Sequence, residues 1–553
     1  MNVKPLFNNN ESPDLKSYMA KLGVDLDIYK DPNFVEPYEL YDNIDKGIGL
    51  LNFAINKCKK DINNKIVIVC DSDCDGYCSA TMAVQFLLSE GLAHNNIKVL
   101  FHTKKQHGLS NDILAQDILT DKEQLQYVTL IWLPDAGTND VDQCDYFNMA
   151  HGIPILITDH HEQSVLNQCA TIINNQTSPK VTNKDLCGTG VTHKLISAYC
   201  TVHSNDFYLN CIDLVALATI SDVMDMRSLE NRTIVKWGIE HINNNFLRGL
   251  CGILIDTEIN PTTLAWKVVP KINAVCRSDN QKLKKRMFFA FVTGKDYSQL
   301  KGLFNETKMK SVVGDMIRMH EKQRADANGL YEQAIKDGYK GDKVKVFSTA
   351  DTPYTGLVAM KLSSHYNCPC MVVHDSGSNF MGSLRSPCDM RTKLKKSGLM
   401  KVCEGHEASC GVGWNKRNTN KLLDYCNDLD LTPNPKDVII STDNIFIGNS
   451  VFSIAKEGKE YWGTGIPDPK IHISNILING QDIKELGRNK TTIKFMYGDV
   501  EFIAFFMSKD KKVQLNVGRD IDMTLEILGT PSINEFKGRE TKQVIIDEWE
   551  IML

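Results

Sequence analysis

The chain has 553 residues, of which 42% are hydrophobic and 24% are charged, and its formal net charge is −5. A chain of this length is too long to fold around one hydrophobic core, and a typical domain size of about 150 residues predicts three or four domains. No run of about 18 apolar residues occurs, and the N-terminus MNVKPLFNNNESPD lacks the apolar core of a signal peptide. We therefore expect a soluble cytoplasmic protein that does not contact a membrane.

The 17 cysteines are an odd number spread over the whole chain, and several, such as Cys70, Cys211 and Cys251, lie in apolar runs. This distribution favours reduced, buried thiols over a disulfide framework. No CxxC pair has a matching second pair, so the sequence predicts no structural zinc site.

Residues 1–60 are expected to form a helical segment packed on the core, because Ile48, Leu51 and Ile55 share one face of an amphipathic run. From residue 61 to 305, apolar strands alternate with helical patterns. The strands are KIVIVC (65–70), NIKVLFHT (96–103), VTLIWLP (128–134) and IPILIT (153–158). Such alternation is typical of a parallel α/β sheet.

Three further segments follow. Residues 306–338 form a long charged helical pattern that we interpret as a connector helix. Residues 339–432 predict a second α/β domain, with strands KVKVFS (343–348), PCMVVH (369–374) and NFMGSLRS (379–386) and the glycine-rich stretch GHEASCGVG (405–413). From 433 to 553, short alternating strands, among them TTIKFMYG (491–498), VEFIAFFM (500–507) and KVQLNVG (512–518), predict a small β-barrel.

Acidic residues follow successive strands of the first sheet. Asp71, Asp73 and Asp75 come after the first strand, Asp135 after a later one, and Asp159 begins the run that includes two histidines. In parallel α/β sheets ligands collect at the carboxyl ends of strands. Burying several carboxylates together is costly unless cations neutralise them, so the pattern predicts a metal site.

Each of these motifs alone has a simpler interpretation, because aspartates often end strands or cap helices. Together they favour a site with oxygen ligands, one or two histidines and no cysteine, which suits Mn²⁺ or Mg²⁺ better than zinc. The supply of carboxylates is sufficient for two ions about 3.5–4 Å apart, an arrangement that hydrolyses phosphodiester bonds. Two such ions would also offset much of the negative net charge, which is otherwise unusual for nucleic-acid binding.

Four motifs in order resemble those of the DHH phosphoesterase superfamily: DSDCDG (71–76), PDAG (134–137), TDHH (158–161) and SDV (221–223). Within it the chain is most similar to RecJ-like single-strand-specific 5′→3′ exonucleases. The stretches HGLS (107–110), INAVCR (272–277), GSLRS (382–386) and EGHEASCG (404–411) support this likeness. The resemblance implies a DHH domain and a second (DHHA1) domain joined by a long helix, then an OB-like barrel.

The resemblance also implies roles for individual residues. The metal ligands would be Asp73, Asp75, Asp135, His160 and Asp222, and the catalytic residues His161, Asp159 and Asp71. Substrate would be bound by Arg277, Asn273, Ser383, Arg385, Gly405 and His406. The chain departs from the family pattern at Val69, Glu404 and Cys276, where relatives usually have histidine, glycine and glycine.

The expected function is metal-dependent hydrolysis of single-stranded DNA from its 5′ end to mononucleotides, in recombination, repair or replication. Two alternatives remain: a DHH phosphodiesterase for oligoribonucleotides or cyclic dinucleotides, and an inactive scaffold at a replication complex. A monomer working with a single-strand-binding protein or helicase is expected. Aromatic residues of the barrel could stack on bases, although most strand aromatics lie in cores. The candidates are Tyr461, Trp462, Phe495, Tyr497 and Phe502.

Overall fold

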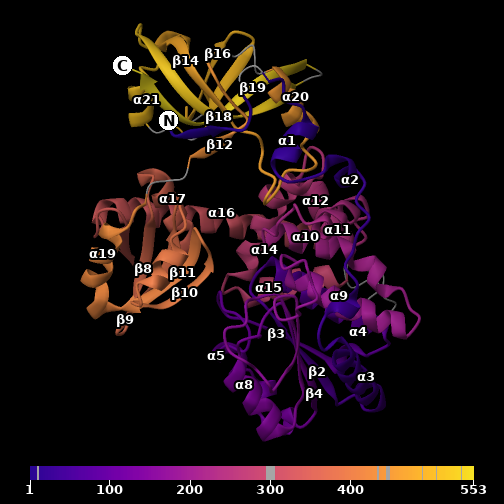
Figure 1. The fold of residues 1–553 in the computed structure, drawn as a ribbon. Helices are drawn as coiled ribbons and strands as arrows, with labels where there is room; N and C mark the ends of the chain where they lie inside the picture. Colours follow the sequence, from indigo (N-terminus) through magenta and orange to yellow (C-terminus); the bar gives the residue numbers. More distant parts are fainter. Residues whose placement is uncertain are drawn as a thin grey trace.

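The computed structural model describes residues 1–552 except 9–10, 294–305, 351, 432–434, 444–448, 488–489, 506, 508 and 537–538. The boundaries expected near residues 305 and 432 fall outside the described residues. Within the described part of the chain, no helix has the length and apolar character needed to span a membrane. Figure 1 shows three lobes: a large lobe that contains most of the residues up to 293, a second lobe from residue 345 to 431, and a C-terminal lobe from residue 435, against which the N-terminus lies.

The large lobe contains the predicted parallel sheet. Its strands are β2 (Lys65–Cys70), β3 (Ile97–Phe101), β4 (Val128–Pro134), β5 (Ile155–Asp159) and β6 (Thr171–Asn174), in the spatial order β3-β2-β4-β5-β6. Both faces are buried, since Ile66 and Ile68 join one hydrophobic core and Val67 and Val69 join another. The strand order reverses between β2 and β4, and such switch points form ligand-binding crevices.

Helices cover this sheet and extend the lobe. On the sheet lie α3 (Ile44–Lys60), α4 (Cys74–Ser89) and α9 (Gly188–Val202), and α10 (Ile212–Ser221) packs on α4 and α9. Further helices of the lobe are α1 (Leu15–Lys21), α2 (Leu26–Lys30), α5 (Asn111–Leu114), α6 (Asp117–Thr120), α7 (Lys122–Leu125), α8 (Val141–Asp145), η3 (Tyr146–Ala150), η4 (Phe207–Cys211), α11 (Leu229–Glu240), α12 (Asn245–Leu254), η5 (Leu264–Val268), α14 (Val269–Cys276) and α15 (Gln281–Val292).

Helix α16 (Glu306–Asp337) lies between the large lobe and the second lobe (Figure 1). It packs on α14 and α15 of the large lobe and on α17 (Thr355–Tyr366) and β7 (Lys345–Thr349) of the second lobe. Its 32 residues rise about 48 Å at 1.5 Å per residue. One continuous helix therefore contacts both lobes.

The second lobe is the predicted α/β unit, with the sheet order β10-β11-β9-β8-β7. Besides β7 it contains β8 (Cys370–Ser376), β9 (Asn379–Arg385), α18 (Arg391–Lys396), β10 (Met400–His406), β11 (Ser409–Asn415) and α19 (Thr419–Asp428). The glycine-rich stretch 405–413 lies in the hairpin β10–β11. Its glycines weakened the strand signal in the sequence.

The C-terminal lobe has a seven-stranded sheet in the order β13-β14-β18-β19-β17-β16-β15. Its elements are β12 (Lys436–Val438), β13 (Ile440–Thr442), α20 (Asn449–Glu457), β14 (Ile471–Asn479), β15 (Lys484–Leu486), β16 (Thr492–Tyr497), β17 (Val500–Ala504), α21 (Lys509–Gln514), β18 (Asp522–Phe536) and β19 (Arg539–Met552). The strand expected at 512–518 is wrong, because that segment continues α21 into a turn. Leu515 is buried there, whereas Val513 is 58% exposed.

The barrel aromatics proposed for base stacking are mostly buried. Phe495 and Phe502 stack on each other inside the lobe, with ring centroids 5.2 Å apart. Tyr461 and Trp462 instead pack against residues outside this lobe. The guanidinium of Arg232 lies 4.7 Å from the Tyr461 ring, and Trp462 packs on an N-terminal tyrosine. Alternation alone does not distinguish a core aromatic from an exposed one.

Candidate metal centre

The turn from β2 into α4 holds two of the predicted metal ligands. Asp73 is the N-cap of α4, and its carboxylate accepts a hydrogen bond from the Gly76 N–H at 3.2 Å. Asp75 is 2% exposed and accepts hydrogen bonds from the backbone N–H groups of Gly188 and Thr189, both at 2.8 Å. Those donors belong to the first turn of α9, a position that favours negative charge.

Asp71 lies deeper and engages two histidines. Its Oδ2 is 2.7 Å from Nδ1 of His107, and its Oδ1 is 3.7 Å from Nε2 of His102. Among the described residues, Oδ1 is buried and has no hydrogen-bond partner. His107 was not predicted as a site residue, although its motif HGLS is part of the family resemblance.

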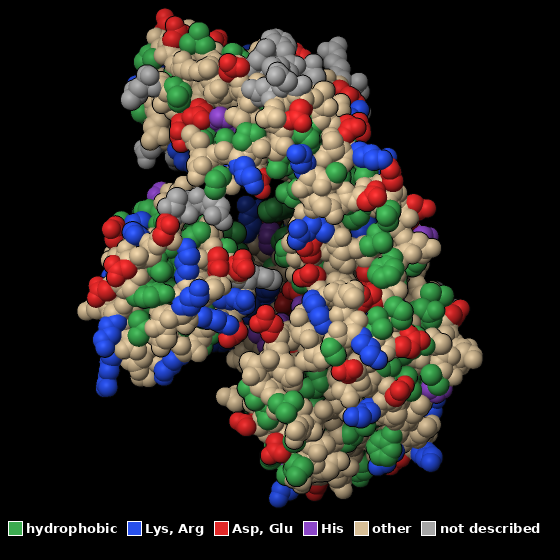
Figure 2. Space-filling model, in the orientation of Figure 1, with side chains coloured by type: hydrophobic (Ala, Val, Ile, Leu, Met, Phe, Trp, Pro, Cys, Tyr) green, Lys and Arg blue, Asp and Glu red, His purple; other side chains and the backbone are tan. Residues whose placement is uncertain are grey.

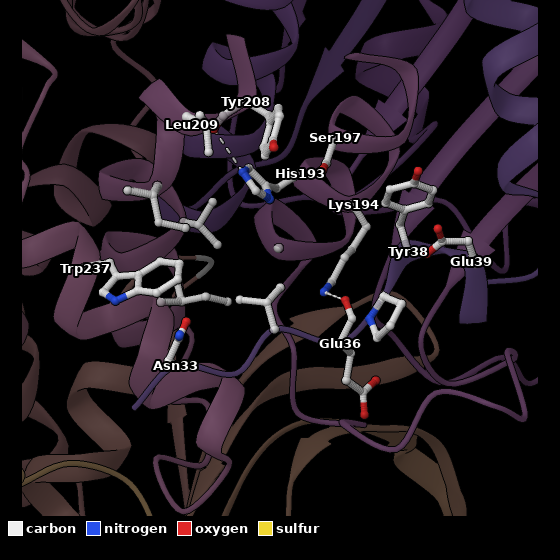
Figure 3. Close-up of a pocket in the computed structure, with 16 residues that line it drawn as sticks. Asn33, Glu36, Tyr38, Glu39, His193, Lys194, Ser197, Tyr208, Leu209 and Trp237 are labelled. Atoms are coloured by element: carbon white, nitrogen blue, oxygen red, sulfur yellow. Dashed lines mark hydrogen bonds between the residues drawn. The ribbon is translucent and has the colours of Figure 1, made fainter. Parts of the chain in front are cut away.

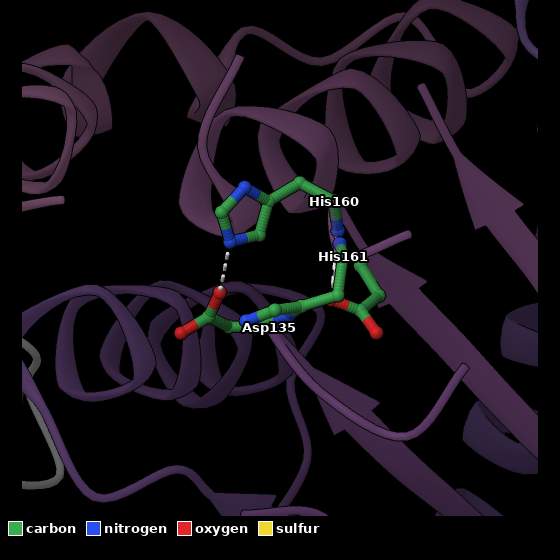
Figure 4. A group of neighbouring side chains, drawn as sticks. Asp135, His160 and His161 are labelled. Carbon is green, nitrogen blue, oxygen red and sulfur yellow. Dashed lines mark hydrogen bonds and ion pairs between the residues drawn. The ribbon is translucent and has the colours of Figure 1, made fainter. Parts of the chain in front are cut away.

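Asp135 follows β4 and adopts a left-handed backbone conformation, with φ of 73°. Its N–H donates to the Thr158 carbonyl at 2.7 Å, which fixes the turn. As Figure 4 shows, the imidazole of His160 points toward this carboxylate, and Nε2 lies 3.4 Å from Oδ1. That Oδ1 is buried without a hydrogen bond from any described residue. Residues in such sparsely populated conformations cluster at functional sites.

Asp222 comes from a different part of the chain, at the C-terminal end of α10. Its Oδ2 lies 3.5 Å from Nε2 of His160, and Asp75 Oδ2 lies 4.0 Å from the same nitrogen. The next residue, Val223, has φ of 59°, a rare conformation for a β-branched residue. Unfavourable backbone geometry thus flanks the centre at both Asp135 and Val223.

The predicted metal ligands and the predicted catalytic residues form three overlapping groups, and within each group the potential ligand atoms lie within 4.8 Å of one another. The groups are Asp71, Asp73 and Asp135; Asp75, His160 and Asp222; and Asp135, Asp159, His160 and His161. Asp135 and His160 each belong to two groups, as expected where two ions would share a carboxylate. The structure therefore brings all five predicted ligands to one place.

The electrostatics of the centre fit bound cations. Burial, and then the charges of neighbouring aspartates, raise the pKa of Asp135 well above its usual value, and the pKa of Asp222 likewise. Burial acts in the same direction on Asp73, but Arg277 and His107 outweigh it and lower the pKa of that carboxyl. Oδ1 of Asp71 and Oδ1 of Asp135 accept no hydrogen bond from any described residue, and the site offers carboxylate and imidazole ligands. Both features suit hard divalent cations.

Asp159 has a different role from the other acids, because its oxygens are already occupied. It accepts hydrogen bonds from the Thr138 hydroxyl at 2.7 Å, from the His160 N–H at 2.7 Å and from Nδ1 of His161 at 2.8 Å. Burial lowers the pKa of His161, but Asp159 outweighs it and raises that pKa to about 10. Asp159 therefore orients the half-exposed ring of His161.

The residues predicted to bind substrate come from both α/β lobes. Arg277 caps α14, and its Nη2 lies 4.0 Å from Asp73 Oδ2. Arg385 and Ser383 lie on β9, where the Ser383 hydroxyl is 2.9 Å from that of Thr355. Burial lowers the pKa of Arg385, and the positive charge of Arg277 adds to this effect, which indicates that the two guanidinium groups are close.

The other substrate-binding predictions differ in outcome. Asn273 uses Oδ1 to accept a hydrogen bond from the Cys74 N–H at 2.9 Å, so it holds α14 against the start of α4. Gly405 has φ of +121°, and an added Cβ would lie 2.9 Å from the Ser409 carbonyl oxygen. The side chain of His406 lies outside the described part of the structure.

Lys105 is a further cation near the site, and it was not among the predicted site residues. It lies in the loop after β3, where the Ser72 hydroxyl donates to the Gln106 carbonyl at 2.6 Å. Burial, and then the charges of Arg277 and Arg385, lower the pKa of Lys105 to about 8. Three cations therefore gather beside the aspartates, although each belongs to a different stretch of sequence.

A cavity of about 410 Å³ lies elsewhere in the large lobe (Figure 3). It is lined by Tyr38, Tyr208, Ile212, Trp237 and other residues of the N-terminal segment and of α9 to α11. Lys194 at its edge donates hydrogen bonds to Glu230 and to the Glu36 carbonyl. None of the predicted site residues lines this cavity.

Two family models match the chain. The N-terminal domain of the DHH family matches residues 65–219, and the RecJ OB domain matches residues 453–548. In both segments the chain resembles RecJ-like proteins of the DHH family. The first match contains Asp73, Asp75, Asp135 and His160, and the second covers most of the C-terminal lobe.

Named relatives match this RecJ-like chain over most of its length. A Bacillus subtilis (strain 168) protein, provisionally named as the SPbeta prophage-derived single-strand DNA-specific exonuclease YorK, is 28% identical over 554 residues, covering 94% of this chain and 92% of that protein. The single-stranded-DNA-specific exonuclease RecJ of Haemophilus influenzae is 23% identical, covering 93% and 92%.

Solved structures show the same fold. The crystal structure of RecJ from Thermus thermophilus in complex with Mn²⁺ has a TM-score of 0.76 at 17% identity, covering 100% of this RecJ-like chain and 78% of that chain. The Mg²⁺ complex from the same organism has a TM-score of 0.70. The predicted succession of two α/β units and an OB-type domain is thereby confirmed.

Proposed function

We propose that this protein is a metal-dependent exonuclease that degrades single-stranded DNA from the 5′ end to mononucleotides. One observation carries this proposal: Asp135 and His160 are each shared between two groups of potential metal ligands. The cations Lys105, Arg277 and Arg385 lie next to these groups. Single-strand-specific exonucleases among the relatives, matched over nearly their full length, favour this substrate over cyclic dinucleotides or oligoribonucleotides.

Asp73, Asp75, Asp135, His160 and Asp222 would hold two Mn²⁺ or Mg²⁺ ions, and Asp71 would support the same group. Bound there, the ions would supply an activated water and neutralise charge at the phosphate. The residues present suit such ions, because buried carboxylate oxygens of Asp71 and Asp135 have no hydrogen-bond partner in the described structure and could bind a cation.

His161 would transfer a proton near the scissile phosphate. Asp159 holds its Nδ1 at 2.8 Å, so that Nε2 remains available, and the ring is 52% exposed. A histidine oriented by a buried carboxylate is a common arrangement for proton transfer. Asp159 would thus act as a positioning residue for His161.

The terminal 5′-phosphate would be bound by Arg277, Arg385 and Ser383, with Gly405 allowing close approach of the backbone. Planar guanidinium groups match phosphate oxygens in pairs. Because these residues come from two lobes, the distance between the lobes would determine where the chain end stops relative to the metals. Hydrolysis would then release one nucleotide at a time.

We further propose the domain division 1–60, 61–305, 306–338, 339–432 and 433–553, with the last domain guiding the strand. Monomeric action in the cytoplasm with a single-strand-binding protein or helicase completes the proposal. An inactive scaffold is disfavoured, because such proteins lose metal ligands and here the ligands converge.

Digestion of a single-stranded oligonucleotide labelled at either end tests the proposal. With Mn²⁺, the 5′ label is expected to appear at once as a mononucleotide, whereas the 3′-labelled strand becomes shorter step by step. Double-stranded DNA should not be degraded. The double variant Asp73→Ala, Asp135→Ala should abolish both signals. Release of the 3′ label first, or activity in the double variant, would contradict it. Faster turnover of a dinucleotide than of a long strand would favour the oligonucleotide phosphodiesterase.

A further inference from the structure

Helix α14 packs on both η5 and α16, and these three elements carry several cations and an exposed aromatic residue. We call these residues the α14–α16 surface, which consists of Trp266, Lys267, Lys271, His320 and Arg324. Trp266 is 76% exposed, the largest exposed fraction among the exposed large hydrophobic side chains of the described residues. It sits on a π-helical turn, and such turns occur frequently at functional sites.

The charges on this surface are crowded and mostly uncompensated. Lys267 pairs with Asp256, but Lys271, His320 and Arg324 make no hydrogen bond or ion pair with any described residue. Burial, and then the charges of Arg324 and Lys267, lower the pKa of Lys271. Like charges held together destabilise the free protein, and a bound polyanion would relieve this repulsion.

The α14–α16 surface is fixed relative to the metal centre. The buried Gln323 of α16 donates from Nε2 to the Ala274 carbonyl of α14 at 2.7 Å. Asn273 of α14 in turn accepts a hydrogen bond from Cys74, the first residue of α4. Helix α14 therefore connects the surface rigidly to the turn that carries the aspartates.

The surface is also within reach of a strand held at the centre. Arg277, which ends α14, lies six positions after Lys271 and eleven after Trp266, so the helical rise separates them by roughly 9 and 16 Å. Figure 2 shows a hollow between the lobes, at the place where Figure 1, in the same orientation, shows α14 and α16. Lys, Arg and His side chains line this hollow, with Asp and Glu side chains among them.

We propose that the α14–α16 surface binds single-stranded DNA adjacent to the nucleotides held at the metal centre, with a base stacked on Trp266 and phosphates near Lys271 and Arg324. This inference rests on the proposed function. An exposed aromatic ring beside unpaired cations matches the way proteins bind single strands without sequence preference. In a duplex the base faces are already stacked, so this surface discriminates against paired DNA.

Binding of a fluorescent, phosphorothioate dT20 that resists hydrolysis tests the stacking site, with Mn²⁺ present. Trp266→Ala is expected to weaken binding about five- to a hundredfold, and Trp266→Phe should retain most of the affinity. The matched control is Tyr146→Ala, an aromatic residue 52% exposed on η3, which should bind like wild type. Affinity of Trp266→Ala within twofold of wild type overturns the proposal.

The phosphate contacts have their own readout. Lys271→Ala and Arg324→Ala are each expected to reduce the slope of log affinity against log salt concentration by about 0.7. Unchanged slopes in both variants contradict the proposal, and this arm remains decisive if a Trp266 variant does not fold. Equal melting temperatures of all variants show that the fold is intact.

Turnover of the dinucleotide pdTpdT separates this inference from the proposed function. A dinucleotide occupies only the scissile bond, so Trp266→Ala should leave its kcat/KM unchanged while that for dT20 falls. An equal loss on both substrates means that Trp266 acts in the centre itself, which contradicts the inference. If wild type binds dT20 through Trp266 but releases no mononucleotide, the exonuclease proposal fails and the binding surface stands.

Discussion

Gly188 shows how closely single residues are fitted around the candidate metal centre. Its N–H donates to Asp75, and a Cβ added to it would lie 2.1 Å from Asp135 Oδ1 and 2.7 Å from the Asp135 Cα. Contacts this short require Asp135, already in the left-handed region, to move. The position therefore admits only glycine while both aspartates keep their places.

Gly188→Ala is accordingly expected to reduce exonuclease activity at least a hundredfold, because displacement of an active-site group by about 1 Å has effects of that size. Activity on labelled single-stranded DNA and Mn²⁺ affinity provide the measurements. Gly252→Ala in α12 is the matched control, since nothing lies within 4 Å of an added Cβ there. Full activity in Gly188→Ala would show that the two aspartates do not act together.

Asp112 offers a test that depends on pH. Burial would raise its pKa, but hydrogen bonds from Ser110 and the Thr103 N–H and the contact with His102 lower it to about 2. The unfolded value is 3.8. A depressed pKa adds stability that is present above about pH 4 and is lost as pH falls toward 2.

Asp112→Asn is expected to lower the free energy of unfolding by about 2 kcal/mol at pH 7, with a smaller difference from wild type at pH 3. Chemical denaturation at both pH values measures this. Asp117→Asn, an exposed acid whose carboxylate accepts no hydrogen bond in the described structure, serves as control. A difference that grows as the pH falls would show that the sign is wrong.

At the scale of elements, the N-terminus belongs partly to the C-terminal lobe. Strand β1 (Val3–Pro5) pairs in parallel with β12, and Phe7, which is buried, donates its N–H to the Ile439 carbonyl at 3.1 Å. The amino group of Met1 lies 3.1 Å from a carboxylate oxygen of Glu526. Nothing in the first ten residues of the sequence indicated a strand.

Deletion of residues 1–7 is expected to destabilise the C-terminal lobe, because β12 loses its partner strand and the pocket around Phe7 opens. Differential scanning calorimetry should show a transition at least 5 °C lower, of the size that roughly 1 kcal/mol produces in a 100-residue domain. Lys4→Ala, a change at a 69% exposed side chain, should leave the transition in place. An unshifted transition would mean that β1 contributes no stability.

At the scale of the whole molecule, cations would change both charge and stability. Two divalent ions would take the formal net charge of −5 to about −1. Ions that bind only the folded state stabilise it by about 2.7 kcal/mol at a hundred times the Kd. The acids crowded around Asp135 would no longer repel one another.

Mn²⁺ is therefore expected to raise the melting temperature of wild type, and Asp135→Asn should lose most of this increase.

Because burial and neighbouring aspartates raise the pKa of Asp135 and Asp222, metal binding should release protons, and more of them at pH 6 than at pH 8. Calorimetric titration in buffers of different ionisation enthalpy counts them. Asp142→Asn, an exposed acid on α8, is the control. Equal Mn²⁺ responses in wild type and Asp135→Asn would contradict this centre.

Much of the fold and of the candidate centre could be predicted because the decisive signals are local. A buried strand followed by an acid places that acid at the carboxyl edge of a parallel sheet, whatever the rest of the chain does. This rule predicts that Asp73, Asp75, Asp135 and His160 lie together. The role of Asp222 as a metal ligand was implied by the resemblance of SDV (221–223) to a DHH motif. The left-handed conformation of Val223 beside it was not predicted.

Only the tertiary structure determined which distant segments contact one another. His107 reaches Asp71 and Lys105 gathers with Arg277 and Arg385 because loops of separate elements meet at the switch point and across two lobes. The barrel aromatics had the right composition for stacking, yet packing buried most of them and left Trp266 exposed. Periodicity by itself determined which residues alternate along a strand or helix; only the packing of lobes determined which faces remain open to a ligand.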